Sequence, residues 1–203
     1  MNRISVFIDG FNLYHALNDK PSYHKYKWLN LEKLSKCFIF PKDTIGKIFY
    51  FTSYITWNPQ KLIRHQIYVK ALQLVGVTPV FGAFRMKDMT CRICHRPYRI
   101  LEEKQTDVNI AIKLFQTATA DSWDKAFIIS GDSDLIPAIK AIKETFPTKQ
   151  INVIIPIGRR AEELKQVTDF HMKIKQKHLQ TCQFDDVIKI DANNTLTRPA
   201  TWS

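Results

Sequence analysis

Long apolar runs, a secretory leader and a cysteine framework are all missing from this 203-residue sequence. No stretch approaches the roughly 20 apolar residues that a membrane helix needs. The first residues, MNRISVFIDG, lack the apolar length and the small-residue cleavage site of a signal peptide. Without such a signal, 4 cysteines do not indicate a disulfide framework, so we expect reduced thiols. These absences predict a cytoplasmic protein with no membrane partner.

Several catalytic signatures are missing as well. The phosphate-loop motif G-x-x-x-x-G-K-[ST] does not occur. An aspartyl phosphatase would carry a second Asp two residues after its nucleophile, yet Phe11 follows Asp9 at that spacing. The 6 histidines show no motif pairing, which disfavours a metal-independent ribonuclease that uses two imidazoles as acid and base.

Acidic residues are scarce in one part of the chain. Residues 20–100 contain 15 Lys and Arg but only 3 Asp and Glu, whereas the remaining residues carry 15 basic and 16 acidic side chains. The net charge of +11 is therefore concentrated in that stretch. A polyanion such as nucleic acid is its natural partner, because neutralising phosphates releases condensed counterions. The alternative is a solvated basic surface that only aids solubility.

Apolar strands alternate with helical periodicity along most of the chain. This pattern predicts an α/β fold in which helices cover both faces of a central, mostly parallel sheet. The expected strands are 3–9, 45–55, 77–84, 125–130 and 150–156, and the expected helices are 29–38, 59–76, 106–119, 133–146 and 160–167.

The length favours a single domain, which we place at residues 1–182. Residues 86–101, MKDMTCRICHRPYRIL, interrupt the alternation and indicate a small cysteine-containing insertion or hairpin. Residues 183–203 end in a polar, weakly patterned stretch and are expected to form a partly flexible C-terminal tail. For the helix 106–119, we expect an apolar face made by Val108, Ala111, Ile112 and Phe115.

Carboxylates follow two of the expected strands. Asp9 ends the first strand, and Asp132 and Asp134 come directly after the strand 125–130. Asp107 opens a helix, with Thr106 as its expected N-cap. Each acid alone fits a turn or a helix cap, but ligands of open parallel sheets bind at the carboxyl ends of strands. If the two strands are neighbours, the acids converge and require a hard cation such as Mg²⁺ or Mn²⁺.

Three motifs in this order resemble the NYN-domain family of LabA-like proteins, a branch of the PIN-like nuclease fold. They are FIDGFNLY, EEKQTDVNIAIKL and FIISGDSDLIPAIKAIK, and the likeness extends from about residue 3 to about residue 180. The resemblance implies a three-layer α/β/α sandwich and a divalent-metal-dependent endoribonuclease acting on RNA. It also implies that Asp9, Asp107, Asp132 and Asp134 bind Mg²⁺ or Mn²⁺ and that Asn12 assists. The alternative is a non-catalytic RNA-binding or regulatory module of the same fold.

The insertion carries a second metal-binding pattern, CRICH. Its spacing also matches a c-type haem attachment, which normally requires export. A zinc site formed by Cys91, Cys94 and His95 is the more plausible metal interpretation, although half of the usual ligand set is missing. The other interpretation is a metal-free basic hairpin.

Basic side chains near these motifs are candidates for phosphate contacts. They are Lys25, Lys27, Arg92, Arg96 and Arg99. Three aromatic residues lie close to Lys25 and Lys27 in the sequence: Tyr23, Tyr26 and Trp28. They fit either base stacking or core packing. A homo-oligomer is compatible with the sequence.

Overall fold

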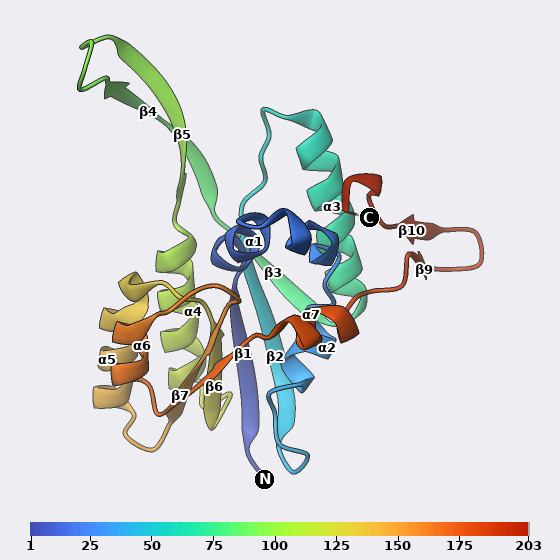
Figure 1. Ribbon diagram of the computed structural model, residues 1–203. Helices are drawn as coiled ribbons and strands as arrows, with labels where there is room; N and C mark the ends of the chain where they lie inside the picture. Colours follow the sequence, from blue (N-terminus) through green and yellow to red (C-terminus); the bar gives the residue numbers. More distant parts are fainter. Residues whose placement is uncertain (203) are drawn as a thin grey trace.

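A parallel sheet forms the centre of the computed structural model, which describes residues 1–202 (Figure 1). The sheet has six strands. They are β1 (Arg3–Asp9), β2 (Thr44–Thr52), β3 (Val77–Phe81), β6 (Lys125–Ile129), β7 (Gln150–Ile155) and β8 (Phe170–Lys173). Their order across the sheet is β3-β2-β1-β6-β7-β8, and every neighbouring pair is parallel. The predicted α/β class with a central parallel sheet is thereby confirmed.

Helices cover both faces of this sheet, as expected for a three-layer sandwich. One face packs against α1 (Gly10–Asn18), α2 (Leu31–Lys36), α3 (Pro59–Leu74) and α7 (Gln176–Thr181). The other packs against α4 (Thr106–Thr119), α5 (Ile136–Thr145) and α6 (Glu162–Val167). Short 3₁₀ segments lie at Pro21–Tyr26, Ser133–Leu135 and Ala200–Trp202. Within residues 1–202, no helix is both long enough and apolar enough to cross a bilayer.

The side chains of β1 alternate between the two faces of the sheet. Ile4, Val6 and Ile8 belong to the core beneath α1 to α3, whereas Phe7 belongs to the core beneath α4 to α6. Successive side chains of a strand point to opposite faces, so residue 9 is directed to the same face as Phe7. The end of β1 thus presents Asp9 on the side covered by α4.

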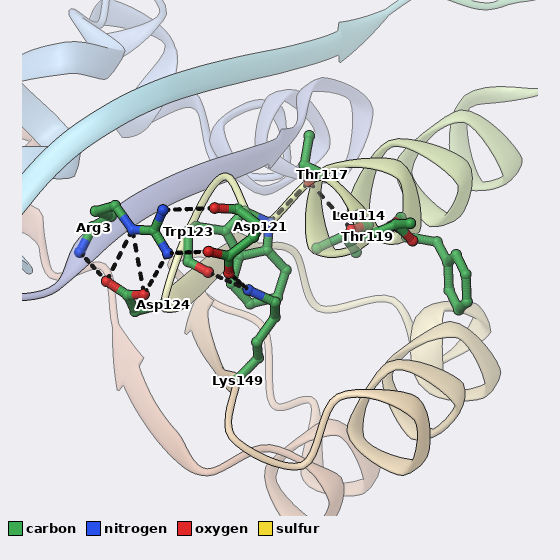
Figure 2. A network of polar contacts seen from close by, with 9 residues as sticks. Arg3, Leu114, Thr117, Thr119, Asp121, Trp123, Asp124 and Lys149 are labelled. Atoms are coloured by element: carbon green, nitrogen blue, oxygen red, sulfur yellow. Dashed lines mark hydrogen bonds and ion pairs between the residues drawn. The ribbon is translucent and has the colours of Figure 1, made fainter.

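A polar network fastens the amino end of β1 to the turn between α4 and β6 (Figure 2). Arg3 Nη2 lies 2.8 Å from Asp124 Oδ1 and 3.0 Å from Asp121 Oδ2. Lys149 joins the network by donating to Asp121 Oδ1 at 2.7 Å. The Arg3 side chain and then its backbone N–H donate to Asp124 and lower the pKa of that carboxyl to about 2. The network lies at the sheet edge opposite Asp9.

The expected insertion is an antiparallel hairpin that projects from the domain (Figure 1). It consists of β4 (Ala83–Thr90) and β5 (Pro97–Lys104), so it is longer than residues 86–101. The strand expected over 77–84 divides at Gly82 between the sheet and this hairpin.

The chain after residue 182 is folded, in contrast to the loose segment that we expected. β9 (Val187–Lys189) and β10 (Thr195–Thr197) form a second small hairpin, and Leu196 is buried. The Trp202 ring lies 6.3 Å from that of Trp28 and 5.7 Å from that of Tyr68. Aromatic packing therefore holds this segment against the domain, while Ser203 lies outside the described residues.

Helix α1, which begins directly after Asp9, was not expected from the sequence. For Trp28 and Tyr26, base stacking and core packing were both open, and both side chains are buried in the core. The expected apolar face of α4 was wrong. In α4 the buried face is formed by Ile110, Leu114 and Ala118, whereas Val108, Ile112 and Phe115 are exposed. The helix is apolar on two sides, and only one of them meets the sheet.

The assignment of the buried face of α4 can be tested with two truncations. Leu114→Ala removes a fully buried side chain and should lower the free energy of unfolding by about 2–5 kcal/mol. Ile112→Ala truncates a side chain that is 49% exposed on the same helix and should change it by less than about 0.5 kcal/mol. Urea denaturation of both variants is the measurement. Equal losses would contradict the assigned face.

Candidate functional site

Three carboxylates from distant parts of the chain meet at the carboxyl edge of the sheet. Asp9 ends β1, Asp132 follows β6, and Asp107 lies in the first turn of α4. Because β1 and β6 are hydrogen-bonded neighbours, their ends deliver the first two acids to one place. One ligand oxygen from each of the three lies within 4.8 Å of the others. We refer to these residues as the acidic triad.

Asp9 is held by donors on both oxygens. The Asn12 backbone N–H donates to Oδ1 at 2.9 Å, so Asp9 is the N-cap of α1. The Ser130 hydroxyl donates to Oδ2 at 2.9 Å, and the Asp132 N–H donates to Ser130 Oγ at 3.1 Å. Asp9 is only 3% exposed. The short chain Asp9–Ser130–Asp132 therefore fixes the two strand ends relative to each other.

Asp132 and Asp134 differ in position although they are two residues apart. Asp132 accepts the Asp134 N–H at 3.0 Å and caps the 3₁₀ segment that leads into α5. We had expected Thr106 to be the N-cap of α4. Thr106 is instead the first residue of α4, and its hydroxyl donates to Glu103. Asp134 is exposed and lies outside the acidic triad.

Burial and mutual repulsion perturb the triad. Burial is the largest influence on Asp9, and with the charges of Asp107 and Asp132 it raises the pKa to about 6, against the lowering effect of the Asn12 and Ser130 hydrogen bonds. Burial, followed by the charge of Asp132, also raises the pKa of Asp107. Clustered carboxylates without a counter-charge repel one another in this way.

Asn12 reaches across to the neighbouring loop. Its Oδ1 accepts the Gly131 backbone N–H at 3.0 Å, so its side chain joins the start of α1 to the loop after β6. This contact gives Asn12 a positioning role at the edge of the triad. A Cβ on Gly10 would lie 2.5 Å from the Phe51 carbonyl oxygen, so glycine lets α1 begin this close to β2.

The pocket around the triad contains residues that sequence reasoning did not assign to it. Besides the triad, Phe11, Asn12, His15, Glu103, Thr106 and Arg159 line it. Arg159 was missed, although it follows the end of β7 as Asp132 follows the end of β6. Its guanidinium pairs with Asp19 at 3.0 Å. The position of Arg159 after a strand of the same parallel sheet was the available signal.

The cysteine motif lies at the tip of the β4–β5 hairpin. The His95 N–H donates to the Cys91 carbonyl at 2.9 Å, and His95 has a positive φ of 54°. The backbone N–H of Cys94, and next that of Ile93, lower the pKa of the Cys91 thiol, which favours a thiolate ligand. Among residues 1–202, the acidic triad is the only cluster of three or more potential ligands. The zinc site at Cys91, Cys94 and His95 stays a prediction that needs ligands from elsewhere.

The predicted phosphate-binding residues fall into two groups. Arg92 and Arg96 are exposed at the hairpin tip, while Arg99 is paired with Asp88 at 2.8 Å. Lys25 and Lys27 lie near α1, and Lys27 Nζ donates to Asn18 Oδ1 at 2.7 Å. Their roles in nucleic-acid binding stay predictions.

A central parallel sheet with helices on both faces and an acidic triad at the carboxyl ends of its strands is the architecture expected of a PIN-like sandwich. The sequence model of the NYN domain matches residues 3–175, so the chain belongs to the NYN domain family. That family lies within the PIN-like superfamily, and its members are generally ribonucleases.

Two further proteins are similar to this chain. The chain is 24% identical, in an alignment 241 positions long, to 6-hydroxy-3-succinoylpyridine 3-monooxygenase HspA from Pseudomonas putida, covering 98% of this chain and 75% of the relative. A crystal structure of a protein of unknown function from Vibrio parahaemolyticus superposes with a TM-score of 0.59 at 15% identity. It covers 86% of this chain and 94% of that chain, and at this identity it supports the fold alone.

The raised pKa of Asp9 predicts a pH dependence of stability in EDTA. A carboxyl with a pKa of 3.8 in the unfolded chain and about 6 in the fold binds more protons when folded between these values. The free energy of unfolding should therefore fall by about 3 kcal/mol in total as pH rises from about 3 to about 7. Urea denaturation across this range is the measurement. Asp9→Asn should flatten the fall, and an unchanged profile would show that another group causes it.

Proposed function

We propose that the protein is a divalent-metal-dependent endoribonuclease whose metal ligands are the acidic triad. The observation that carries the proposal is the convergence of Asp9, Asp107 and Asp132 within 4.8 Å at the carboxyl edge of the sheet. Membership of a family that acts on RNA supports RNA as the substrate. The concentration of positive charge in residues 20–100 supports a polyanionic partner.

The donor set fits a hard divalent cation. All three ligands are carboxylates, which Mg²⁺ and Mn²⁺ prefer over softer donors. Burial, followed by the charges of neighbouring carboxylates, raises the pKa of Asp9 and Asp107, and a bound cation would oppose this rise by stabilising the ionised forms. When bound, such an ion would supply Lewis-acid stabilisation of phosphate charge and a more acidic water.

The chain's own groups contribute position and charge. Ser130 and the Asn12 N–H hold the Asp9 carboxylate in one orientation. Asn12 Oδ1 fixes the loop that carries Asp132. Arg159 brings a positive charge to the same pocket and is placed to attract a phosphate group. Asp134, expected among the ligands, raises the pKa of Asp107 through its charge and in our proposal stays outside the inner set.

A second candidate comes from the curated relative. Its name assigns it the 3-monooxygenation of a pyridine that carries an acid side chain. An aromatic pocket beside the triad, lined by Tyr14, Tyr68 and Arg64, fits a planar ring with an anionic group. The acidic triad favours the nuclease, and the relative's chemistry predicts no RNA cleavage. A non-catalytic RNA-binding module is the third candidate function, and it predicts RNA binding without cleavage.

Cleavage of labelled RNA by the purified protein tests the proposal. We expect cleavage with Mn²⁺ that EDTA abolishes. Asp9→Asn and Asp132→Asn should lower the rate by about 100-fold or more, because changing even outer-shell partners of metal ligands costs 10- to 100-fold. Asp134→Asn is the matched control, since it removes the same charge two residues from Asp132, and it should keep most of the activity. Asp9→Asn and Asp132→Asn variants that are folded and as active as the parent would refute the site.

The basic hairpin tip can be tested through the salt dependence of RNA binding. Replacing Arg92 and Arg96 by Ala should weaken binding and reduce the slope of log affinity against log salt by about 1.4, because each neutralised phosphate of a single strand contributes about 0.7. Replacing Lys42 and Lys47 removes the same charge near the amino end of β2, far along the strand from the triad edge, and should leave the slope unchanged. Identical slopes for both double variants would exclude the tip as an RNA contact.

A further inference from the structure

A second pocket lies on the other side of α1 from the triad and shares Phe11 with the triad pocket. Five distant segments build it: α1, the loop that contains Lys27, the end of β2 with the loop after it, α3 and the C-terminal 3₁₀ segment. Its aromatic and apolar lining residues are Phe11, Leu13, Tyr14, Tyr50, Tyr68 and Trp202. The Tyr68 and Trp202 rings stand edge to face at 5.7 Å. Flat, polarisable walls of this kind suit a planar ring.

Three cations, Lys27, Lys61 and Arg64, line this pocket, and no acidic residue among residues 1–202 does. Lys27 Nζ lies 5.0 Å from the centre of the Tyr14 ring. Lys61 and Arg64 come from the first two turns of α3. Within residues 1–202, neither Lys61 nor Arg64 has an ion pair with a carboxylate. The charges are therefore available to an anionic ligand.

The other polar lining groups are neutral. His65 accepts or donates a hydrogen bond at 3.1 Å with Thr52, and burial lowers its pKa to about 4, so the imidazole is uncharged at neutral pH. Burial, and next the charge of Arg64, lowers the pKa of Lys27, which indicates that the cations crowd one another. An anion between them relieves this repulsion. The pocket thus offers aromatic walls and three cations that no carboxylate within it neutralises.

We propose that this pocket binds one nucleotide of the RNA substrate, with the base against the aromatic walls and a phosphate against Lys61 and Arg64. The proposal rests on the RNA-cleaving function and adds to it a site that holds the strand next to the position of cleavage. Phe11, which belongs to both pockets, places the two sites side by side. Aromatic stacking with backbone neutralisation is the general mode of single-strand binding.

Titration of uridine 5′-monophosphate into the protein in EDTA tests this site without any contribution from a bound metal. We expect binding that weakens about tenfold or more in Arg64→Ala, because contacts to a charged group are worth at least one factor of ten in affinity. Lys61→Ala, at an exposed position, should give a similar loss if the first variant is poorly folded. Lys70→Ala removes one charge further along α3, outside the pocket, and should bind like the parent.

Ring recognition is tested by Tyr14→Ala. It should weaken binding of the nucleotide but leave the weak binding of inorganic phosphate unchanged. In RNA cleavage, Arg64→Ala should raise KM about tenfold with little change in kcat, because the contact lies away from the reacting phosphate.

The possible outcomes distinguish failure of the nucleotide site from failure of the proposed nuclease function. Nucleotide binding that depends on Arg64, in a protein that does not cleave RNA, would refute the nuclease and keep the nucleotide site. RNA cleavage with nucleotide affinity unchanged in Arg64→Ala and Lys61→Ala would refute the nucleotide site alone. Binding of a small pyridine carboxylate in place of the nucleotide would also overturn it, because the same chemistry would then serve a free heteroaromatic acid.

Discussion

The parallel pairing of β1 with β6 is the constraint on which the candidate site depends. It makes two strands that are more than 100 residues apart in sequence end side by side. Ser130, directly after β6, donates to Asp9 at the end of β1 and accepts the Asp132 N–H. At the opposite edge, Arg3 ties the start of β1 to the turn that precedes β6. The pair is therefore fixed at both ends, and the acids have little freedom to separate.

The same arrangement creates an electrostatic cost. Asp9 is almost completely buried, and its neighbours Asp107 and Asp132 have the same charge. The cluster does not add to the stability of the fold, because an uncompensated buried charge is destabilising. The fold supports the cluster because hydrogen bonds hold it and because a large apolar core exists on each face of the sheet.

Short-range patterns in the sequence predicted the sheet and the projecting hairpin, because strand ends and helix starts are local signals. The convergence of the acids was predicted only if β1 and β6 are neighbours, and that pairing is not a local signal. Periodicity failed for α4, where Val108, Ile112 and Phe115 form a second apolar stripe that competes with the buried one. Trp28 was ambiguous, since nothing in its neighbourhood distinguishes a core ring from a stacking ring. The aromatic pocket could not be predicted from the sequence, because its walls come from segments as distant as those of Tyr14 and Trp202.

Both Asp9 and Asp132 cap helical segments in addition to lying in the triad. A chain that drifted away from catalysis would still be under selection to keep them, because losing an N-cap costs about 1 kcal/mol of stability. The presence of these two aspartates in a related protein is therefore weak evidence that the related protein is catalytically active. Asp107 is not a helix cap, so its presence or absence in a related protein is the better indicator of whether the proposed activity was kept.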